Sequence, residues 1–149
     1  MSCWKMFLAG IVAGICLLLV MGAGYQWAGT PGFCGSCHSR ELAHRTWQAS
    51  NHRQFDCIEC HLPHGSFAES FGYKAKAGLR DVRDEFSRNY SVVTPVTPEA
   101  NKILQDNCLR CHSSTVADTR MNRGETQCTL CHRNLVHGRG EPKGVLFSE

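Results

Sequence analysis

The sequence predicts a mainly α-helical protein with much irregular structure, in which one N-terminal membrane-spanning helix precedes a single small domain. Two observations lead to this expectation. A long uncharged segment lies near the start of the 149 residues, over residues 7–28. Residues 29–149 contain only about 34 apolar side chains once the cysteines of a repeated motif are set aside, too few for a side-chain core of this size. Something other than side chains therefore has to fill the interior of the domain.

The uncharged segment reads FLAGIVAGICLLLVMGAGYQWA. As a helix it would be about 33 Å long, enough to cross the hydrocarbon core of a bilayer. Tyr25 and Trp27 lie near its end, where membrane helices often carry interfacial aromatic residues. A cleaved signal peptide is the alternative, but the apolar stretch is long for one and no clear cleavage site follows. We therefore expect a retained anchor over residues 7–28.

One pentapeptide, Cys-x-x-Cys-His, occurs four times after this segment. It is the attachment signature of c-type haem. Two thiols three residues apart on one turn can each form a thioether to the same porphyrin, and the adjacent imidazole then lies under the iron as an axial ligand. The attachment cysteines are Cys34, Cys37, Cys57, Cys60, Cys108, Cys111, Cys128 and Cys131, and the motif histidines are His38, His61, His112 and His132. The sequence predicts four covalently attached haem c groups.

Other uses of paired cysteines explain the pattern less well. A zinc site does not need a histidine after every cysteine pair, iron–sulfur clusters use other spacings, and structural disulfides leave the histidines unexplained. The two cysteines outside the motifs, Cys3 and Cys16, receive no role.

Four haems complete the predicted fold. With about 30 residues per haem, the porphyrins themselves would form the core of residues 29–149. Because haem c is attached outside the bacterial cytoplasm, residues 1–6 would be cytoplasmic and residues 29–149 periplasmic, on the inner membrane. The formal charge of +3 becomes about −5 if eight propionates ionise, so the basic chain does not indicate nucleic-acid binding.

Four irons need up to eight axial ligands, and four histidines lie outside the motifs: His44, His52, His64 and His137. His44 and His64 follow their own motif histidines too closely to reach round the same ring easily, so they could serve other haems or none. His52 and His137 are better placed as distal ligands of other haems. At least one iron could remain open to a substrate or to a ligand from a partner.

The longest gap between motifs predicts an amphipathic helix over residues 67–89. Ser66 and Glu69 form a capping box, and apolar residues follow at helical spacing. Lys74, Gly78 and Asp81 share one stripe of this helix, where a lysine donor and a carboxylate proton acceptor could bind a quinol. A solvated, salt-bridged face is the alternative. After a loop, Thr97 caps a second helix expected to run from Pro98 to Asn107, and an irregular tail is expected from Gly138.

Nearly the whole chain resembles the membrane-anchored tetrahaem quinol dehydrogenases of the NapC/NirT family, and among them most the small-subunit type that serves cytochrome c nitrite reductase. The resemblance is carried by FCGSCH (33–38), SNH (50–52), CIECHLPH (57–64), YKAKAGLRDV (73–82) and CHRNLVH (131–137). It implies a protein that takes electrons from menaquinol in the membrane and passes them to a periplasmic multihaem reductase, with the catalytic nitrite reductase subunit as the expected partner.

The resemblance also implies site residues, with haems numbered in motif order. His112 and His137 would ligate haem 3, and His132 and His52 would ligate haem 4. Haem 2 would hold His61, and a lysine of the partner reductase would fill its other axial position. Lys74 and Asp81 match the quinol-site residues of the family, beside haem 1.

One position departs from the family pattern. The family usually has a methionine two residues after the first motif histidine and uses it as the haem 1 ligand, whereas this chain has Arg40 there. Either His38 ligates haem 1, as the motif chemistry predicts, or another group does.

The predicted function is quinol oxidation beside haem 1 followed by electron transfer along the haems. Three rival functions remain. The chain could be an anchored electron carrier without its own quinol site, or a donor to a different reductase. It could also be a reductase itself, with an open haem as catalytic iron, although no acid–base cluster is visible near the motifs.

Overall fold

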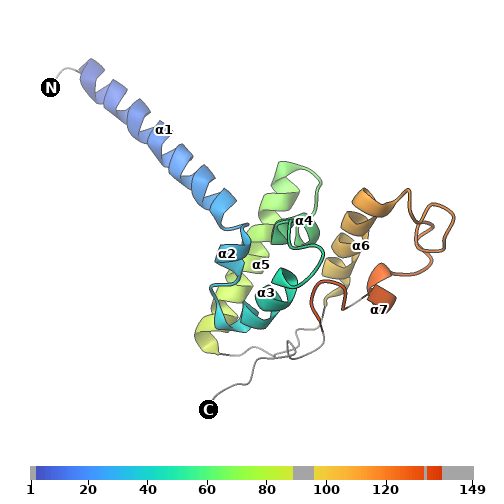
Figure 1. The fold of residues 1–149 in the computed structure, drawn as a ribbon. Helices are drawn as coiled ribbons and strands as arrows, with labels where there is room; N and C mark the ends of the chain where they lie inside the picture. Colours follow the sequence, from blue (N-terminus) through green and yellow to red (C-terminus); the bar gives the residue numbers. More distant parts are fainter. Residues whose placement is uncertain (1–2, 89–95, 133, 139–149) are drawn as a thin grey trace, which may run out of the picture.

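The computed structural model describes residues 3–88, 96–132 and 134–138. Within these ranges the chain forms helices joined by turns, and they contain no strand. Figure 1 shows one long helix, α1, that projects away from a cluster of shorter helices. The mainly helical fold class predicted from the sequence is confirmed.

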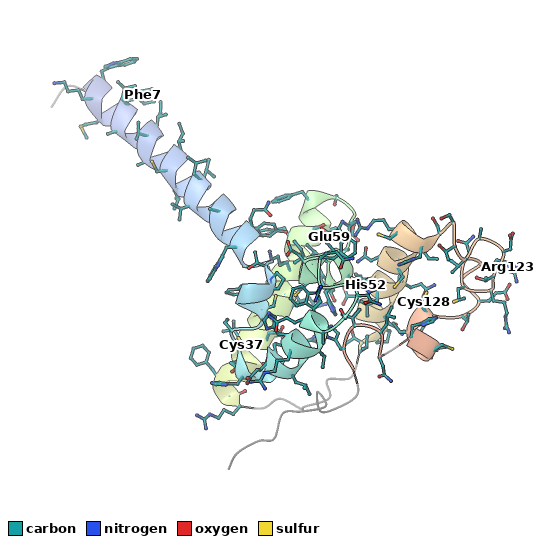
Figure 2. All side chains as sticks on the ribbon, viewed as in Figure 1. Phe7, Cys37, His52, Glu59, Arg123 and Cys128 are labelled. Carbon is teal, nitrogen blue, oxygen red and sulfur yellow. The ribbon has the colours of Figure 1, made fainter. Side chains whose placement is uncertain are left out.

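Helix α1 (Cys3–Trp27) contains almost all of the predicted anchor; it begins four residues before residue 7 and ends one residue before residue 28. Its best window has a mean hydropathy of 2.5 and no buried residue, so it is long and apolar enough to cross a membrane. Side chains project outward along its length with no other element beside them (Figure 2). A helix apolar on all sides needs an apolar solvent around it.

The end of α1 is fixed to the domain by close packing. The ring of Tyr25 stacks on Phe71, with centroids 5.8 Å apart, and lies 6.1 Å from Phe67. At Gly29 a side chain would meet Ile58, because a Cβ atom there would lie 2.9 Å from the Ile58 Cδ1 atom. The Thr30 side chain then caps α2 (Pro31–Cys34) by accepting a hydrogen bond from the Phe33 N–H. The anchor therefore enters the domain at a defined position.

Two short elements follow the first haem motif. A 3₁₀ turn, η1 (His38–Arg40), leads directly into α3 (Glu41–Gln48). Helix α3 was not predicted, because it is only about two turns long and has few apolar residues. It carries His44, whose ring stacks on Trp47 with centroids 5.6 Å apart.

Helix α5 (Phe67–Ser87) matches the predicted amphipathic helix. The Ser66 side chain accepts a hydrogen bond from the Glu69 N–H, as the capping box predicts. The helix ends at Ser87, before the predicted end at residue 89, because Arg88 leaves the helical conformation with φ 51° and ψ 28°; residue 89 itself lies outside the described residues. In Figure 1 α5 runs crosswise to the line of α1.

Helix α6 (Pro98–His112) begins as expected, because the Thr97 side chain accepts a hydrogen bond from the Ala100 N–H. The expected end at Asn107 is wrong, since the helix continues through the third motif to His112. Asn107 does not cap the helix because its side chain makes tertiary contacts instead. Two single-turn helices carry the second and fourth motifs, α4 (Cys57–His61) and α7 (Cys128–His132). The expected irregular tail lies, beyond Gly138, outside the described residues.

Very little of the described chain is buried by protein atoms. Ile103, at 8% exposed, is the one buried apolar side chain in the described ranges, and Asn107, at 6%, is the one buried polar side chain. Both lie on α6, where it packs against α4. A domain of this length normally buries well over half of its surface. The polypeptide alone therefore leaves its interior open, in agreement with the shortage of apolar residues.

Asn107 joins α6 to α4, and its loss should weaken the domain. Its Nδ2 atom donates to the Cys60 and Leu62 carbonyl oxygens, each at 2.9 Å. Because Asn107→Ala would leave two carbonyls without these donors, we expect the free energy of unfolding to fall by about 2 kcal/mol. Urea unfolding of the detergent-solubilised holoprotein, followed by far-UV circular dichroism, measures this. Asn122→Ala is the control, because Asn122 is exposed; equal losses in the two variants would contradict the prediction.

Candidate functional site

The four motifs present their cysteines in the local geometry that haem attachment needs. The second, third and fourth motifs each lie on an α-helical turn, in α4, at the end of α6 and in α7. The first motif starts at the last residue of α2 and ends in η1. On a helical turn, side chains three residues apart lie on one face. The two cysteines of each motif can therefore bond to the same porphyrin.

Successive motifs lie next to one another. A hydrogen bond with the Cys57 thiol lowers the pKa of Cys34 to about 7, and the same bond raises the pKa of Cys57. Burial, followed by the nearby Cys128 thiol, raises the pKa of Cys108 to about 11. Burial and the nearby Cys111 raise the pKa of Cys60. These contacts bring motif one beside two, two beside three, and three beside four, so the attachment points form one connected row.

The distal histidine candidates lie beside motif histidines. The rings of His61 and His137 have centroids 5.9 Å apart. Desolvation by the surrounding side chains, followed by the neighbouring His137, lowers the pKa of His61 to about 4, and desolvation also lowers the pKa of His137. Both imidazoles are therefore held neutral, which is the form that ligates iron.

His52 lies beside His112, with ring centroids 6.3 Å apart. Its Nδ1 atom is buried and has no hydrogen-bond partner among the described residues. A buried polar atom without a partner is costly in a folded protein. An iron-bound imidazole next to a porphyrin is one way to satisfy such a ring. The histidine rings that lie side by side, 61 with 137 and 52 with 112, are not the pairs expected to ligate one iron, which are 112 with 137 and 132 with 52. The expected ligand pairs stay a prediction.

The two histidines left open by the sequence have other contacts. The His44 ring stacks on Trp47 and packs so closely on Gly35 that a Cβ atom there would lie 2.5 Å from it. His64 places Nε2 3.2 Å from the carbonyl oxygen of Glu59. Both positions have a structural role without an iron.

The residues present fit four haem c groups. The chain offers four cysteine pairs on compact turns, imidazoles held in the neutral form, one orphaned imidazole nitrogen and an interior that its own side chains do not fill. Zinc fits less well, because no group of three or more histidine, cysteine or acidic side chains converges in the described ranges.

The candidate quinol residues lie on the face of α5 that meets the end of α1 and the first motif. Lys74 Nζ donates to the Tyr25 carbonyl oxygen at 2.5 Å and lies 3.9 Å from the centre of the Tyr25 ring. Burial lowers the pKa of Lys74. At Gly78 a Cβ atom would meet nothing within 4 Å, so the expected gap between the two ionisable groups is open.

Asp81 lies one helical turn beyond this gap. Its Oδ1 atom accepts a hydrogen bond from Arg40 Nη2 at 2.7 Å. The structure therefore brings together three positions that the sequence singled out: Lys74, Asp81 and the unusual Arg40.

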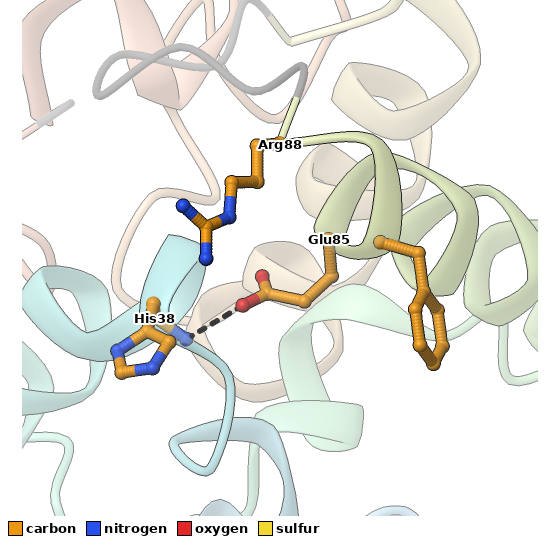
Figure 3. Close-up of a pocket in the computed structure, with 4 residues that line it drawn as sticks. His38, Glu85 and Arg88 are labelled. Atoms are coloured by element: carbon orange, nitrogen blue, oxygen red, sulfur yellow. Dashed lines mark hydrogen bonds between the residues drawn. The ribbon is translucent and has the colours of Figure 1, made fainter.

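Sequence reasoning missed Glu85, which follows Asp81 on the same face of α5. The Glu85 carboxylate accepts hydrogen bonds from the N–H groups of His38, at 3.1 Å, and Ser39, at 3.2 Å. Figure 3 shows it directed at the His38 nitrogen, with Arg88 nearby, in a hollow of about 510 Å³. The signal was present in the sequence, because residues 74, 78, 81 and 85 follow one stripe at helical spacing.

Comparison with known proteins agrees with this arrangement. The family model of the NapC/NirT cytochrome c family, N-terminal region, matches residues 1–142. The chain belongs to the NapC/NirT cytochrome c family. Among its relatives, the cytochrome c nitrite reductase subunit NrfH of Nitratidesulfovibrio vulgaris is 30% identical over 93% of this chain and 86% of its own length. The cytochrome c-type protein NrfH of Wolinella succinogenes is 27% identical over 73% of this chain and 69% of its own.

A solved structure extends the likeness to three dimensions. A chain in the crystal structure of the cytochrome c nitrite reductase NrfHA complex, bound to the HQNO inhibitor, matches with a TM-score of 0.78 and 29% identity. The match covers 92% of this chain and 93% of that one. The family membership carries covalently bound haem c with it, and together with α1 it makes the chain a membrane-anchored cytochrome c.

Glu85 should hold the turn that carries His38. Hydrogen bonds from the Ser39 side chain, and then from the backbone N–H groups of Ser39 and His38, lower the pKa of Glu85. The carboxylate is thus ionised at neutral pH, and its contribution is lost as the pH falls through this lowered pKa. We expect Glu85→Gln to reduce amide-exchange protection at residues 38–39 at neutral pH, and acidification to do the same in wild type.

Hydrogen–deuterium exchange with mass spectrometry, on holoprotein in detergent, measures this protection. Glu99→Gln is the matched control, because the Glu99 carboxylate pairs with Lys76 and not with the turn. Wild-type protection of the turn in Glu85→Gln would show that the carboxylate does not hold it.

Proposed function

We propose that this chain oxidises menaquinol at the face of α5 beside the first haem motif, and that it passes the electrons through four haems to the catalytic subunit of a cytochrome c nitrite reductase. The observation that carries the proposal is the placement of Lys74 and Asp81. Lys74 contacts the end of the membrane helix, and Asp81 contacts the turn that follows His38. A quinol leaving the bilayer along α1 would meet both groups beside the first electron acceptor.

The placement of α5 supports a site at the membrane surface. Tyr25 at the end of α1 packs on the first turns of α5. Helix α5 also exposes a row of large apolar side chains: Phe67, Phe71, Leu79, Val82 and Phe86. Such a row beside a membrane anchor is suited to contact with lipid. In this proposal residues 7–28 cross the inner membrane, residues 1–6 are cytoplasmic and residues 29–149 form the periplasmic haem domain.

Asp81 and Lys74 have complementary roles in quinol oxidation. A quinol that becomes a quinone releases two electrons and two protons. Asp81 accepts the two protons one after the other at a carboxylate oxygen and passes each to water, because its side chain is 44% exposed and an ionised carboxylate within hydrogen-bond reach of the hydroxyl can act as general base. Lys74 donates a hydrogen bond to the other quinol oxygen or balances negative charge that develops on it. The partly buried position of Lys74 strengthens this interaction, because burial reduces screening by water.

The chain's own residues also determine how the cofactors are held. The eight motif cysteines would form the thioether bonds. The motif histidines with His52 and His137 would supply nitrogens that hold the iron, and a neutral imidazole such as that of His61 suits this role. The bound haems supply one-electron acceptors in series. The assignment of four haems rests on the four motifs and on family membership.

The similarity to NrfH proteins supports the choice of partner. Two such relatives and one chain of an NrfHA complex match most of this chain. We therefore infer that the electrons pass to a periplasmic multihaem nitrite reductase, with a partner lysine completing the ligands of haem 2.

Two rival functions can be distinguished by simple measurements. An anchored carrier without a quinol site would be reduced by another protein but not by a quinol. A reductase in its own right would reduce nitrite as an isolated chain. The placement of Lys74 and Asp81 between anchor and first motif favours quinol oxidation over both rivals.

Reduction of the purified holoprotein by a menaquinol analogue tests the proposal. Haem reduction is followed in a stopped-flow spectrometer under anaerobic conditions. We expect Asp81→Asn to lower the rate by about a hundredfold, because a general base contributes about that much or more. We expect Lys74→Met to lower the rate by about tenfold, because a charge-assisted hydrogen bond is lost.

Matched control variants on α5 show whether a loss of rate is specific to Lys74 and Asp81 or follows from any such substitution in this helix. Asp84→Asn makes the same change at a carboxylate paired with Arg83, and Lys76→Met makes the same change at an ammonium paired with Glu99. Both controls should retain the wild-type rate. An unchanged rate in Asp81→Asn, or no reduction of wild type, would exclude this site.

A further inference from the structure

Arg40 makes a contact that the proposed function does not yet explain. It is the last residue of η1, and its guanidinium Nη2 atom lies 2.7 Å from Asp81 Oδ1 on α5. The two side chains are 41 positions apart in the chain and come from different elements. The side chain that follows the first motif therefore contacts the carboxylate proposed to accept the quinol proton.

The turn that carries Arg40 is held by a different interaction. The Glu85 carboxylate accepts the N–H groups of His38 and Ser39, so η1 is joined to α5 through its backbone. The Arg40 side chain is therefore not needed to keep the turn in place. The hydrogen bond that the Arg40 side chain donates restrains Asp81 instead.

The ion pair contributes little to stability. The Arg40 side chain is 35% exposed and that of Asp81 is 44% exposed. Ion pairs with this much solvent around them are weak, because water screens the charges. Orientation is a different matter, since a short charge-assisted hydrogen bond fixes which carboxylate oxygen is engaged and restricts rotation of the side chain.

We propose that Arg40 is a positioning residue of the quinol site; this inference rests on the proposed quinol oxidation at Asp81. Arg40 engages Oδ1 and so holds the carboxylate in one orientation. The other oxygen, Oδ2, is the one that this bond does not use, and it is the atom that accepts the quinol proton. Arg40 does not itself exchange a proton with the quinol. It reduces the number of carboxylate orientations that the quinol would otherwise meet.

The test compares Arg40→Gln and Arg40→Lys with wild type in quinol-analogue reduction of the holoprotein. Because a small misplacement of a reacting group can cost up to about a hundredfold, we expect Arg40→Gln to lower the rate of haem reduction at saturating analogue by about tenfold, with little change in the analogue concentration that gives half of that rate. Arg40→Lys keeps the charge and should restore most of the rate. Combining Arg40→Gln with Asp81→Asn should be no worse than Asp81→Asn alone, because the two residues act as one unit.

Two readouts other than activity detect a merely structural role. The haem absorption and electron paramagnetic resonance spectra should not change in Arg40→Gln, and amide protection at residues 38–39 should remain. Arg83→Gln is the control, because it breaks an ion pair with Asp84 elsewhere on α5 and should retain full rate.

The outcomes separate this inference from the proposed function. A normal rate in Arg40→Gln together with a slow Asp81→Asn would overturn the inference and leave quinol oxidation at Asp81 intact. Changed haem spectra or lost protection in Arg40→Gln would also overturn it, since Arg40 would then hold the haem turn. Multiplying effects in the double variant would show that Arg40 acts independently of Asp81. A normal rate in Asp81→Asn would remove the proposed function itself.

Discussion

The polypeptide does not fill the interior of its own domain, and the rest of the structure depends on this fact. In the described ranges, protein atoms bury only the side chains of Ile103 and Asn107, both where α6 packs on α4. The short helices α4 and α7 are single turns, too short to be stable without partners. Porphyrins attached to these turns would give them an apolar surface to pack on. The haems would then serve at once as cofactors, as the core of the domain and as the path of the electrons. This is why so short a chain can carry four haems.

A second interaction, between η1 and α5, connects that interior to the membrane. Glu85 binds the backbone of the turn and Asp81 binds the Arg40 side chain, while Lys74 on the same face binds the end of α1. One helix face therefore carries the candidate proton acceptor and contacts both the anchor and the first haem motif. The order of these contacts along α5 matches the path from bilayer to haem that quinol oxidation requires.

The sequence predicted those features that depend on local chemistry. The four motifs, the uncharged anchor, the capping box at Ser66 and the stripe with Lys74 and Asp81 all follow from spacing along the chain, and the helices that carry them are confirmed. It could not predict contacts between distant segments. The bond from Arg40 to Asp81, the two carbonyls bound by Asn107 and the role of Glu85 depend on how η1, α4, α5 and α6 pack. For the same reason α6 was predicted to stop at Asn107, whereas α3 was missed because it is short and has few apolar residues.

The most direct test of the central claim is the number of haems bound to one chain. The intact mass of the purified protein, measured under denaturing conditions that remove every non-covalent ligand, gives this number without reference to activity. The account predicts the mass of the polypeptide plus four haems, with all eight motif cysteines protected from thiol reagents. A mass that corresponds to three haems or fewer would contradict it, because the remaining motif would then have to form its part of the interior from side chains that the chain does not have.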